Sequence, residues 1–186
     1  MKTFTSYKYP IRVNKLTVNI YMILSIFIFY LCTPKGNCQE HSFGINAGFS
    51  RNIFKDHSID FPSYGVQYTF YTPVNISFGL NNFLGFYKED SYTRGLIIID
   101  PFVGYRFNIS DKFYPEFCLE YGLVVFADMI PDINANVGGS AGVKYHLLNW
   151  LNIGIKYHLL YEYAWYNGII DQLALECNIS LIRHKK

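Results

Sequence analysis

The chain has 186 residues, about the length of one domain, and is 51% hydrophobic and 19% aromatic, which excludes a disordered chain but leaves the fold class open. Its formal net charge of +2 depends on the N-terminus, because residues 1–38 hold five Lys or Arg and no Asp or Glu. The remaining 11 basic and 14 acidic side chains give residues 39–186 a net charge of −3, which gives no support for nucleic-acid binding.

The N-terminus has the layout of a secretory signal peptide. Four basic residues precede the apolar run "IYMILSIFIFYLC" at 20–32, and "TPKGNCQE" follows it. The run covers 13 residues, whereas a transmembrane helix needs about 20, so a retained anchor is the weaker interpretation. Gly36 and Cys38 are the small residues before a cleavage site. We therefore predict a signal peptide over 1–38 and a mature domain over 39–186 that begins near Gln39.

After residue 39, apolar residues alternate with small or polar residues in eight runs. Successive side chains of a strand point to opposite faces, so each run predicts a strand with one apolar and one polar face. In the seventh run Lys156, His158 and Glu162 share one face, and the opposite face is entirely apolar or aromatic. The runs cover 43–50, 64–70, 75–81, 97–107, 116–125, 134–145, 151–162 and 172–181.

The volume of the apolar face decides which face is inside. The interior of an eight-stranded barrel is only just filled by side chains, and dozens of bulky apolar residues do not fit into it. The face rich in Gly, Ser and Asn does fit. The sequence therefore predicts an all-β fold, an eight-stranded antiparallel transmembrane β-barrel with an up-and-down meander, whose apolar face contacts lipid. We expect a structural network of charged side chains in its lumen, formed by Asp100, Arg106, Glu116, Glu120, Lys144, Lys156, His158, Glu162 and Glu176.

An even number of strands places both chain ends on one side of the membrane, which we expect to be the periplasm. The short connections on that side are predicted at 71–75, 108–112 and 147–150. The outward loops are predicted at 51–63, 87–95, 128–132 and 164–168. Pro101 interrupts the fourth run and predicts a β-bulge there.

Six segments together resemble a known group of proteins. They are "FGINAGFS", "YGVQYTF", "ISFGLNNFLGFYK", "IDPFVGYRF", "VGGSAGVKYHL" and "LNIGIKYHLLYEY". The chain resembles the small OmpA/OmpX-type outer-membrane β-barrels of Gram-negative bacteria, including the porin family or PorT-like barrels, over essentially 41–182. The resemblance implies an outer-membrane location. One departure is the C-terminus, which reads "SLIRHKK" rather than ending on an aromatic residue.

Two enzymatic or transport interpretations compete with a structural lumen. Outer-membrane lipid A deacylases are barrels with a His and a Ser two residues apart, but Leu160 stands two residues after His158, and only Ser140 across the neighbouring strand could replace that nucleophile. The inward charges could instead line a narrow ion path. The sequence contains no phosphate loop or metal-ligand spacing, and Cys118 and Cys177 fall on opposite strand faces, so we expect no cofactor, metal site or disulfide.

The sequence thus favours a non-enzymatic integral outer-membrane protein. We expect a monomer that contacts outer-membrane lipid and serves envelope structure or surface interaction, with a protein or ligand bound through the outward loops 51–63 and 87–95. The alternatives are an outer-membrane lipid A-type hydrolase that uses His158 and a secreted lipocalin-like ligand carrier.

Overall fold

The computed structural model describes residues 40–53, 58–89, 92–127, 132–163 and 168–182. The predicted signal peptide over 1–38 lies outside these residues and stays a prediction. Among the residues described, no helix is long and apolar enough to span a membrane.

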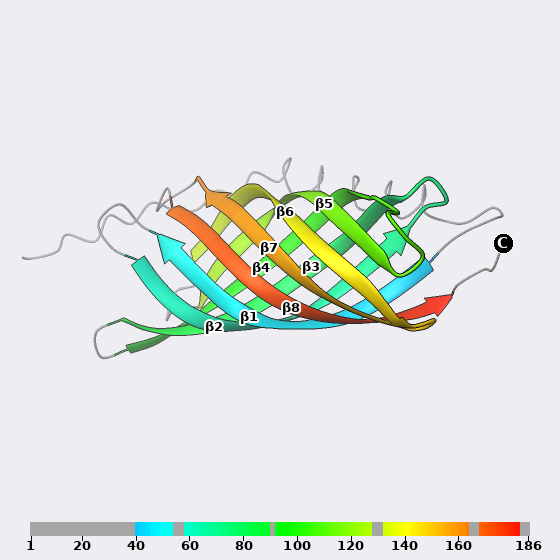
Figure 1. The fold of residues 1–186 in the computed structure, drawn as a ribbon. Helices are drawn as coiled ribbons and strands as arrows, with labels where there is room; N and C mark the ends of the chain where they lie inside the picture. Colours follow the sequence, from blue (N-terminus) through cyan, green and yellow to red (C-terminus); the bar gives the residue numbers. More distant parts are fainter. Residues whose placement is uncertain (1–39, 54–57, 90–91, 128–131, 164–167, 183–186) are drawn as a thin grey trace, which may run out of the picture. The chain divides into compact units, whose positions relative to one another are not determined.

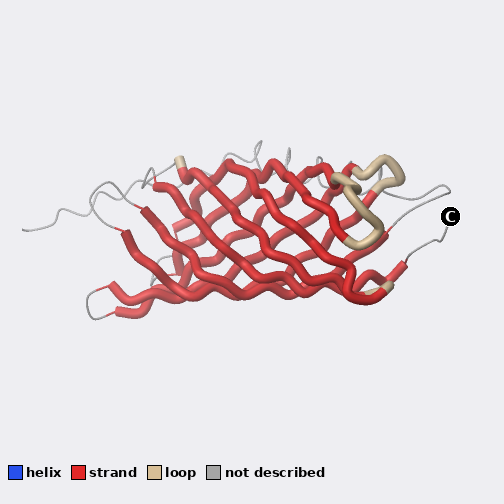
Figure 2. The backbone as a smooth tube through the Cα atoms, in the orientation of Figure 1, coloured by secondary structure: helices blue, strands red, loops and turns tan. Residues whose placement is uncertain are grey.

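The described residues form eight strands that close into a barrel (Figures 1 and 2). Each strand pairs antiparallel with its neighbours in the sequence, and β1 also pairs with β8, so every strand has two partners. This confirms the predicted fold class and meander. The strands are β1 (Glu40–Ile53), β2 (Ser58–Tyr71), β3 (Ile76–Glu89), β4 (Tyr92–Arg106), β5 (Phe113–Ala127), β6 (Asp132–Leu148), β7 (Leu151–Glu162) and β8 (Gly168–Ile182).

The faces of the strands are oriented as the alternation predicts. On β7 and β8 most apolar positions point outward, and Leu159 and Leu175 are 49% and 64% exposed. The polar positions point into the lumen, where Lys156 and His158 have no exposed surface. The outside of these strands is therefore mainly apolar, and their charged residues Lys156, His158, Glu162 and Glu176 point into the lumen.

Three short turns lie at the end of the barrel where β1 begins and β8 ends, on the right in Figure 2. We call this the proximal end and the opposite end the distal end. The turns cover 72–75, 107–112 and 149–150, close to the predicted short connections. In the first turn Asn75 has a positive φ of 64°, a conformation that Asn tolerates better than most residues, and its N–H donates to the Thr72 carbonyl at 3.0 Å.

Two of the predicted outward loops, 51–63 and 87–95, are much shorter than expected, whereas the other two agree with the strand ends to within one residue. β1 continues to Ile53 and β2 begins at Ser58, so most of 51–63 is paired strand. Likewise β3 and β4 take up all of 87–95 except 90–91. The reason is that apolar side chains such as Phe61 and Leu96 point into the distal half of the lumen. The prediction assumed that every inward residue is polar, so it assigned such segments to loops. The connections at 54–57, 90–91, 128–131 and 164–167 lie outside the described residues.

The predicted bulge at Pro101 is wrong. The pairing of β4 with β3 keeps one register through Pro101, which faces Leu80, and the pairing with β5 resumes in the same register after Asp100 and Pro101. Because Pro lacks an N–H group, the local ladder to β5 is interrupted without an inserted residue. The register shifts of the barrel lie elsewhere, between His41 and Ser42 and between His146 and Leu148.

An apolar cluster fills the distal half of the lumen. Its members come from six strands and are at most 5% exposed. They are Phe61, Phe83, Tyr87, Leu96, Ile98, Val124, Phe126, Leu160 and Ile170. Glycines make room for some of the large rings, since a Cβ on Gly85 would lie 2.3 Å from the Phe61 ring. The apolar cluster therefore lies toward the distal end of the lumen, where buried polar residues such as Asn52 and Glu162 also lie.

Candidate functional site: the charged lumen

The proximal part of the lumen holds an ion pair between β1 and β4. Arg106 Nη1 donates to Glu40 Oε2 at 2.8 Å, and Ser180 Oγ of β8 donates to the other carboxylate oxygen at 2.6 Å. The guanidinium carbon lies 4.3 Å and 5.1 Å from the ring centroids of Tyr71 and Tyr114, within cation–π range. Glu40 thus links the first and last strands to a residue across the lumen.

Lys144 is the centre of the ion-pair network. Its Nζ lies 3.1 Å from Glu116 Oε2 and 3.3 Å from Glu176 Oε2, and it donates to the Tyr71 hydroxyl at 3.2 Å. All four side chains are buried. Opposite charges at this distance interact far more strongly in a buried site than in water, and this attraction offsets part of their desolvation cost.

Lys156 extends the network toward the distal end. Its Nζ lies 3.9 Å from Glu116 Oε2 and 4.8 Å from the centroid of the Phe102 ring. Glu116 therefore lies between two lysines, with Lys144 the nearer. The network so far alternates negative and positive groups along the lumen.

The two lysines belong to a short repeat, "GVKYHLL" at 142–148 and "GIKYHLL" at 154–160, on adjacent antiparallel strands. Gly142 faces Lys156 and Lys144 faces Gly154 in the register. A Cβ on Gly142 would lie 3.0 Å from Lys156 Cγ, and one on Gly154 would lie 2.9 Å from Lys144 Cγ. Each lysine stem therefore crosses over the glycine of the other repeat.

Glu120, His158 and Ser140 form the distal group of the network. His158 Nδ1 lies 3.0 Å from Glu120 Oε2, and Ser140 Oγ donates to Glu120 Oε1 at 2.6 Å. Ser140 and His158 are direct neighbours in the β6–β7 register. In a catalytic triad the serine hydroxyl instead bonds to the second imidazole nitrogen. Here that nitrogen, His158 Nε2, has no hydrogen-bond partner among the described residues, and the hydroxyl is bound to the carboxylate. The arrangement holds three side chains in place but presents no activated nucleophile.

The remaining two predicted residues are Asp100 and Glu162. Asp100 is buried and accepts a hydrogen bond from Asn136 Nδ2 at 2.8 Å. Glu162 is buried at the distal end of β7, on the same face as Lys156 and His158. The sequence did not identify Glu40, Tyr71 or Tyr114 as members. Their signal is weak, because each stands at or beyond the edge of a predicted run.

A ring contact marks the boundary between the two halves of the lumen. The Phe83 ring meets the His158 ring edge to face, with 4.9 Å between the centroids. Phe83 belongs to the distal apolar cluster. Among the residues that the structure describes, no group of three or more His, Cys, Asp or Glu side chains could hold a metal ion.

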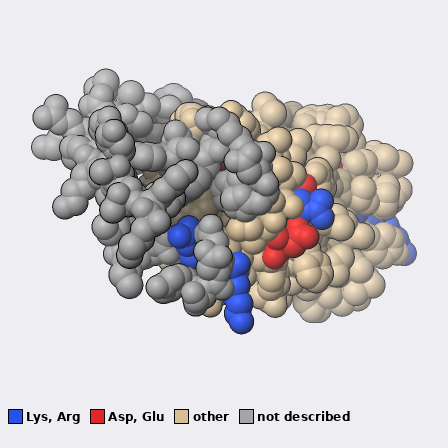
Figure 3. All heavy atoms as spheres, turned by 90° about the vertical axis from the view of Figure 1, so that its left-hand side faces the viewer, with Lys and Arg blue, Asp and Glu red and all other residues tan. Residues whose placement is uncertain are grey.

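Charged side chains at the distal end lie on the outer surface. Figure 3 views this end and shows scattered basic and acidic side chains. Arg51 Nε donates to Asp60 Oδ1 at 2.7 Å on the outside of β1 and β2, and both side chains are more than half exposed. Lys88 is exposed near the end of β3. Exposed pairs of this kind contribute at most about 1 kcal/mol, so they mark a hydrated rim rather than a structural lock.

Comparison with known protein families gives no match, and comparison with characterised protein sequences gives none either. Solved structures do resemble this barrel. Neisserial surface protein A superposes with a TM-score of 0.68 at 13% identity, over 76% of this chain and 97% of that one. Ail, the attachment invasion locus protein of Yersinia pestis, superposes with a TM-score of 0.58 at 12% identity, over 77% of this chain and 99% of that one. The chain has the fold of these barrels.

Proposed function

We propose that this chain is an integral outer-membrane protein that spans the bilayer as a closed, non-enzymatic β-barrel. It belongs with the small OmpA/OmpX-type barrels, including the porin family and PorT-like proteins, and it is exported by a signal peptide that is cleaved near Gln39. The proximal end faces the periplasm and the distal end faces outward.

The single observation that carries this proposal is the inverted distribution of side chains. Exposed apolar residues cover the outside of all eight strands, and charged residues such as Glu116, Lys144 and Lys156 are buried in the lumen. A water-soluble protein exposes single apolar residues but not a continuous apolar belt. In a bilayer the same belt is solvated by lipid, and the closed ladder leaves no unpaired strand edge in hydrocarbon. The same inversion disfavours a secreted lipocalin-like carrier, whose apolar face would line the barrel.

Tyrosines on the outer face support this placement. Tyr105 and Tyr145 lie toward the proximal end, and Tyr161 and Tyr163 toward the distal end, all at least 39% exposed. Aromatic residues of this kind form girdles at the two membrane interfaces. The outer surface therefore has the apolar belt and both of the borders that a bilayer requires.

The composition of the lumen supports a scaffold rather than an enzyme or a pore. Every charged group of the proximal half contacts an opposite charge or a hydrogen-bond donor, and the distal half is filled by the apolar cluster. A hydrated path for ions would need polar groups through both halves. The functional contacts then belong to the outward end of the barrel, through the connections within 51–63 and 87–95, in envelope structure or surface interaction.

The test is to express the full chain in a Gram-negative host and separate the inner and outer membranes. We expect the protein in the outer-membrane fraction, insoluble without detergent, and with a gel mobility that changes on heating because the barrel unfolds. A protein recovered from the periplasm in water-soluble form would overturn the proposal. Sequencing of the N-terminus from envelope material tests the cleavage separately, and a mature start before residue 32 would refute the signal peptide.

A further inference from the structure

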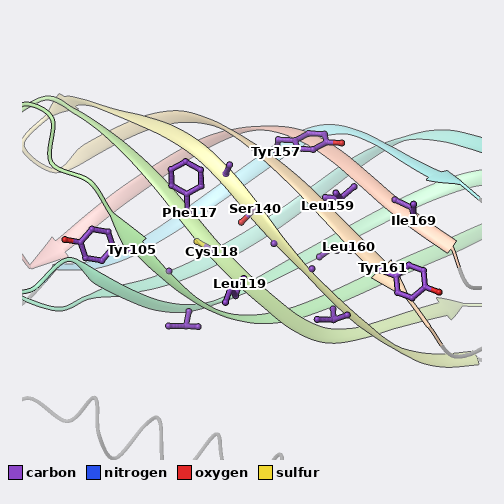
Figure 4. Close-up of a pocket in the computed structure, with 16 residues that line it drawn as sticks. Tyr105, Phe117, Cys118, Leu119, Ser140, Tyr157, Leu159, Leu160, Tyr161 and Ile169 are labelled. Carbon is purple, nitrogen blue, oxygen red and sulfur yellow. The ribbon is translucent and has the colours of Figure 1, made fainter.

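The outer surface of the barrel is hollowed over β5, β6 and β7. The hollow has a volume of about 850 Å³ and is lined almost entirely by carbon. This volume lies within the range of about 300–1,000 Å³ that ligand pockets occupy. We call it the β6 groove. It includes Val103, Tyr105, Phe117, Leu119, Val137, Gly139, Ala141, Tyr157, Leu159, Tyr161 and Ile169 (Figure 4).

Small residues on β6 form the floor of the groove. In the register Gly139 lies between Leu119 of β5 and Leu159 of β7, and Ala141 lies in the same way between Phe117 and Tyr157. The flanking Leu119 and Phe117 side chains are 71% and 56% exposed, so they stand out as walls. A Cβ on Gly139 would meet only the Cys118 carbonyl, which leaves the space above the floor open.

The width of the groove fits one hydrocarbon chain. Strands are spaced about 4.8 Å apart, so the walls on β5 and β7 stand about 10 Å apart. One row of methylene carbons between them lies about 5 Å from each wall, near the optimal carbon–carbon contact of about 4 Å. A second barrel is convex and rigid. It would reach the floor only with single side chains, and a stable protein interface needs about 800 Å² from each partner.

Tyrosines border the lining on two sides. Figure 4 shows Tyr105 and Tyr161 at opposite ends of the lining, with Leu119 and Ser140 between them. Tyr105 of β4 pairs with Phe117 and lies outside the β5 wall, whereas Tyr161 of β7 pairs with Val137 on the floor. The floor between the two walls therefore runs along β6 within the apolar belt.

We infer that the β6 groove binds one acyl chain of a membrane phospholipid. This inference rests on the proposed membrane location. Lipid hydrocarbon is the medium around the belt, and a flexible chain is the occupant that can fill a narrow groove along its whole length. Elsewhere on the belt, chains lie against protruding side chains and exchange without a fixed site.

The test reconstitutes the mature protein in phosphatidylcholine vesicles that contain a small fraction of phosphatidylcholine with a photoreactive diazirine in one acyl chain. After illumination, mass spectrometry of the peptides maps the labelled residues. We expect labelling of 137–141 and 157–161 to exceed that of the equally lipid-facing segment 43–49 at least about fourfold, the occupancy ratio that corresponds to one additional buried methylene group.

A matched pair of substitutions tests the groove itself. Ala141→Leu fills the floor, whereas Ala47→Leu adds the same side chain to the outer face of β1, away from the groove. We expect Ala141→Leu to reduce the labelling of 157–161 to the level of 43–49, and Ala47→Leu to leave it unchanged. The heat-dependent gel shift verifies that each variant is folded.

The remaining outcomes separate the groove from the membrane location. Uniform labelling around a folded barrel, or unchanged labelling in Ala141→Leu, would overturn the groove and leave the membrane location standing. A folded protein labelled on no strand would overturn the proposed function as well.

Discussion

Neighbouring residues in the middle of β8 provide the sharpest test of the side-chain orientation. Leu175 lies seven residues from either end of the strand and is 64% exposed. Glu176 points into the lumen, is 3% exposed, and lies 3.3 Å from Lys144 Nζ. We compare Leu175→Arg with Glu176→Gln.

Leu175→Arg places a charge in hydrocarbon near the bilayer midplane, which costs about 2–4 kcal/mol and lowers the folding equilibrium constant about 30- to 900-fold. Glu176→Gln keeps the shape of the side chain and an oxygen that accepts from Lys144, while Lys144 retains Glu116 at 3.1 Å. Its cost is the difference between a charged and a neutral hydrogen bond, about 1 kcal/mol.

The assay is urea-dependent folding into phospholipid vesicles, measured as the folded fraction by gel mobility without heating. Leu175→Ala is the control, because it removes the leucine without adding charge. The orientation would be refuted if Leu175→Arg folded as well as wild type, or if Glu176→Gln were the more harmful substitution. Either result would mean that the assigned register of β8 is wrong.

Four further predictions use the same or simple assays. Lys144→Met leaves buried carboxylates without their nearest cation and should lower the unfolding free energy by about 3–5 kcal/mol; a loss below that of an exposed ion pair would contradict the network. Gly154→Ala brings a Cβ to 2.7 Å from the Val143 carbonyl oxygen and should cost about 1–3 kcal/mol, whereas Gly95→Ala, with no contact under 3.3 Å, should be nearly neutral in the same titration. His158→Ala should leave the lipid A profile of expressing cells unchanged, and loss of an acyl-chain cleavage in that variant alone would support the hydrolase. The wild-type protein should give no stepwise ion conductance in a planar bilayer, and a steady single-channel current would show that the apolar cluster does not close the lumen.

The fold and the two faces of the wall could be predicted because one physical rule acts at each position. Successive side chains of a strand point to opposite faces, so Ile155 and Lys156 must lie on opposite sides of the barrel wall. The choice of the outer solvent followed from volume, since the apolar face is too large for an eight-stranded interior. Neither the alternation of faces nor the volume argument requires knowledge of which strands are in contact.

The distal ends of the strands could not be predicted by the same rule. In the first part of β2 the inward residues Ile59 and Phe61 are apolar and the outward residue Asp60 is charged, so the alternation is reversed. Such a segment reads as a charged loop if the lumen is expected to be polar. Only the positions of the opposing strands show that six of them deliver apolar side chains to the same half of the lumen.

The contacts between side chains across the lumen could not be predicted from the sequence either. The Ser140–His158 pairing follows from a hairpin and could be predicted from the position of its turn. By contrast, Glu40 and Arg106 are 66 residues apart and meet only because the barrel closes with a particular stagger between its strands. The charged residues of a lumen can therefore be identified from sequence, but not their partners.

This difference points to the role of the buried charges in the barrel. Buried ion pairs contribute little net stability, because desolvation offsets most of their attraction. They do penalise a wrong register. A shift of β7 by one residue would turn Lys156 and His158 toward lipid and bring Tyr157 into the lumen. Every residue of the strand would then lie on the wrong face, which would destabilise the barrel at each position. The belt outside and the cluster inside could otherwise exchange places at the distal end of a strand such as β5, where Val124, Val125 and Phe126 make both faces apolar. The charged proximal half removes that ambiguity, so we assign it the function of fixing which face of each strand points inward.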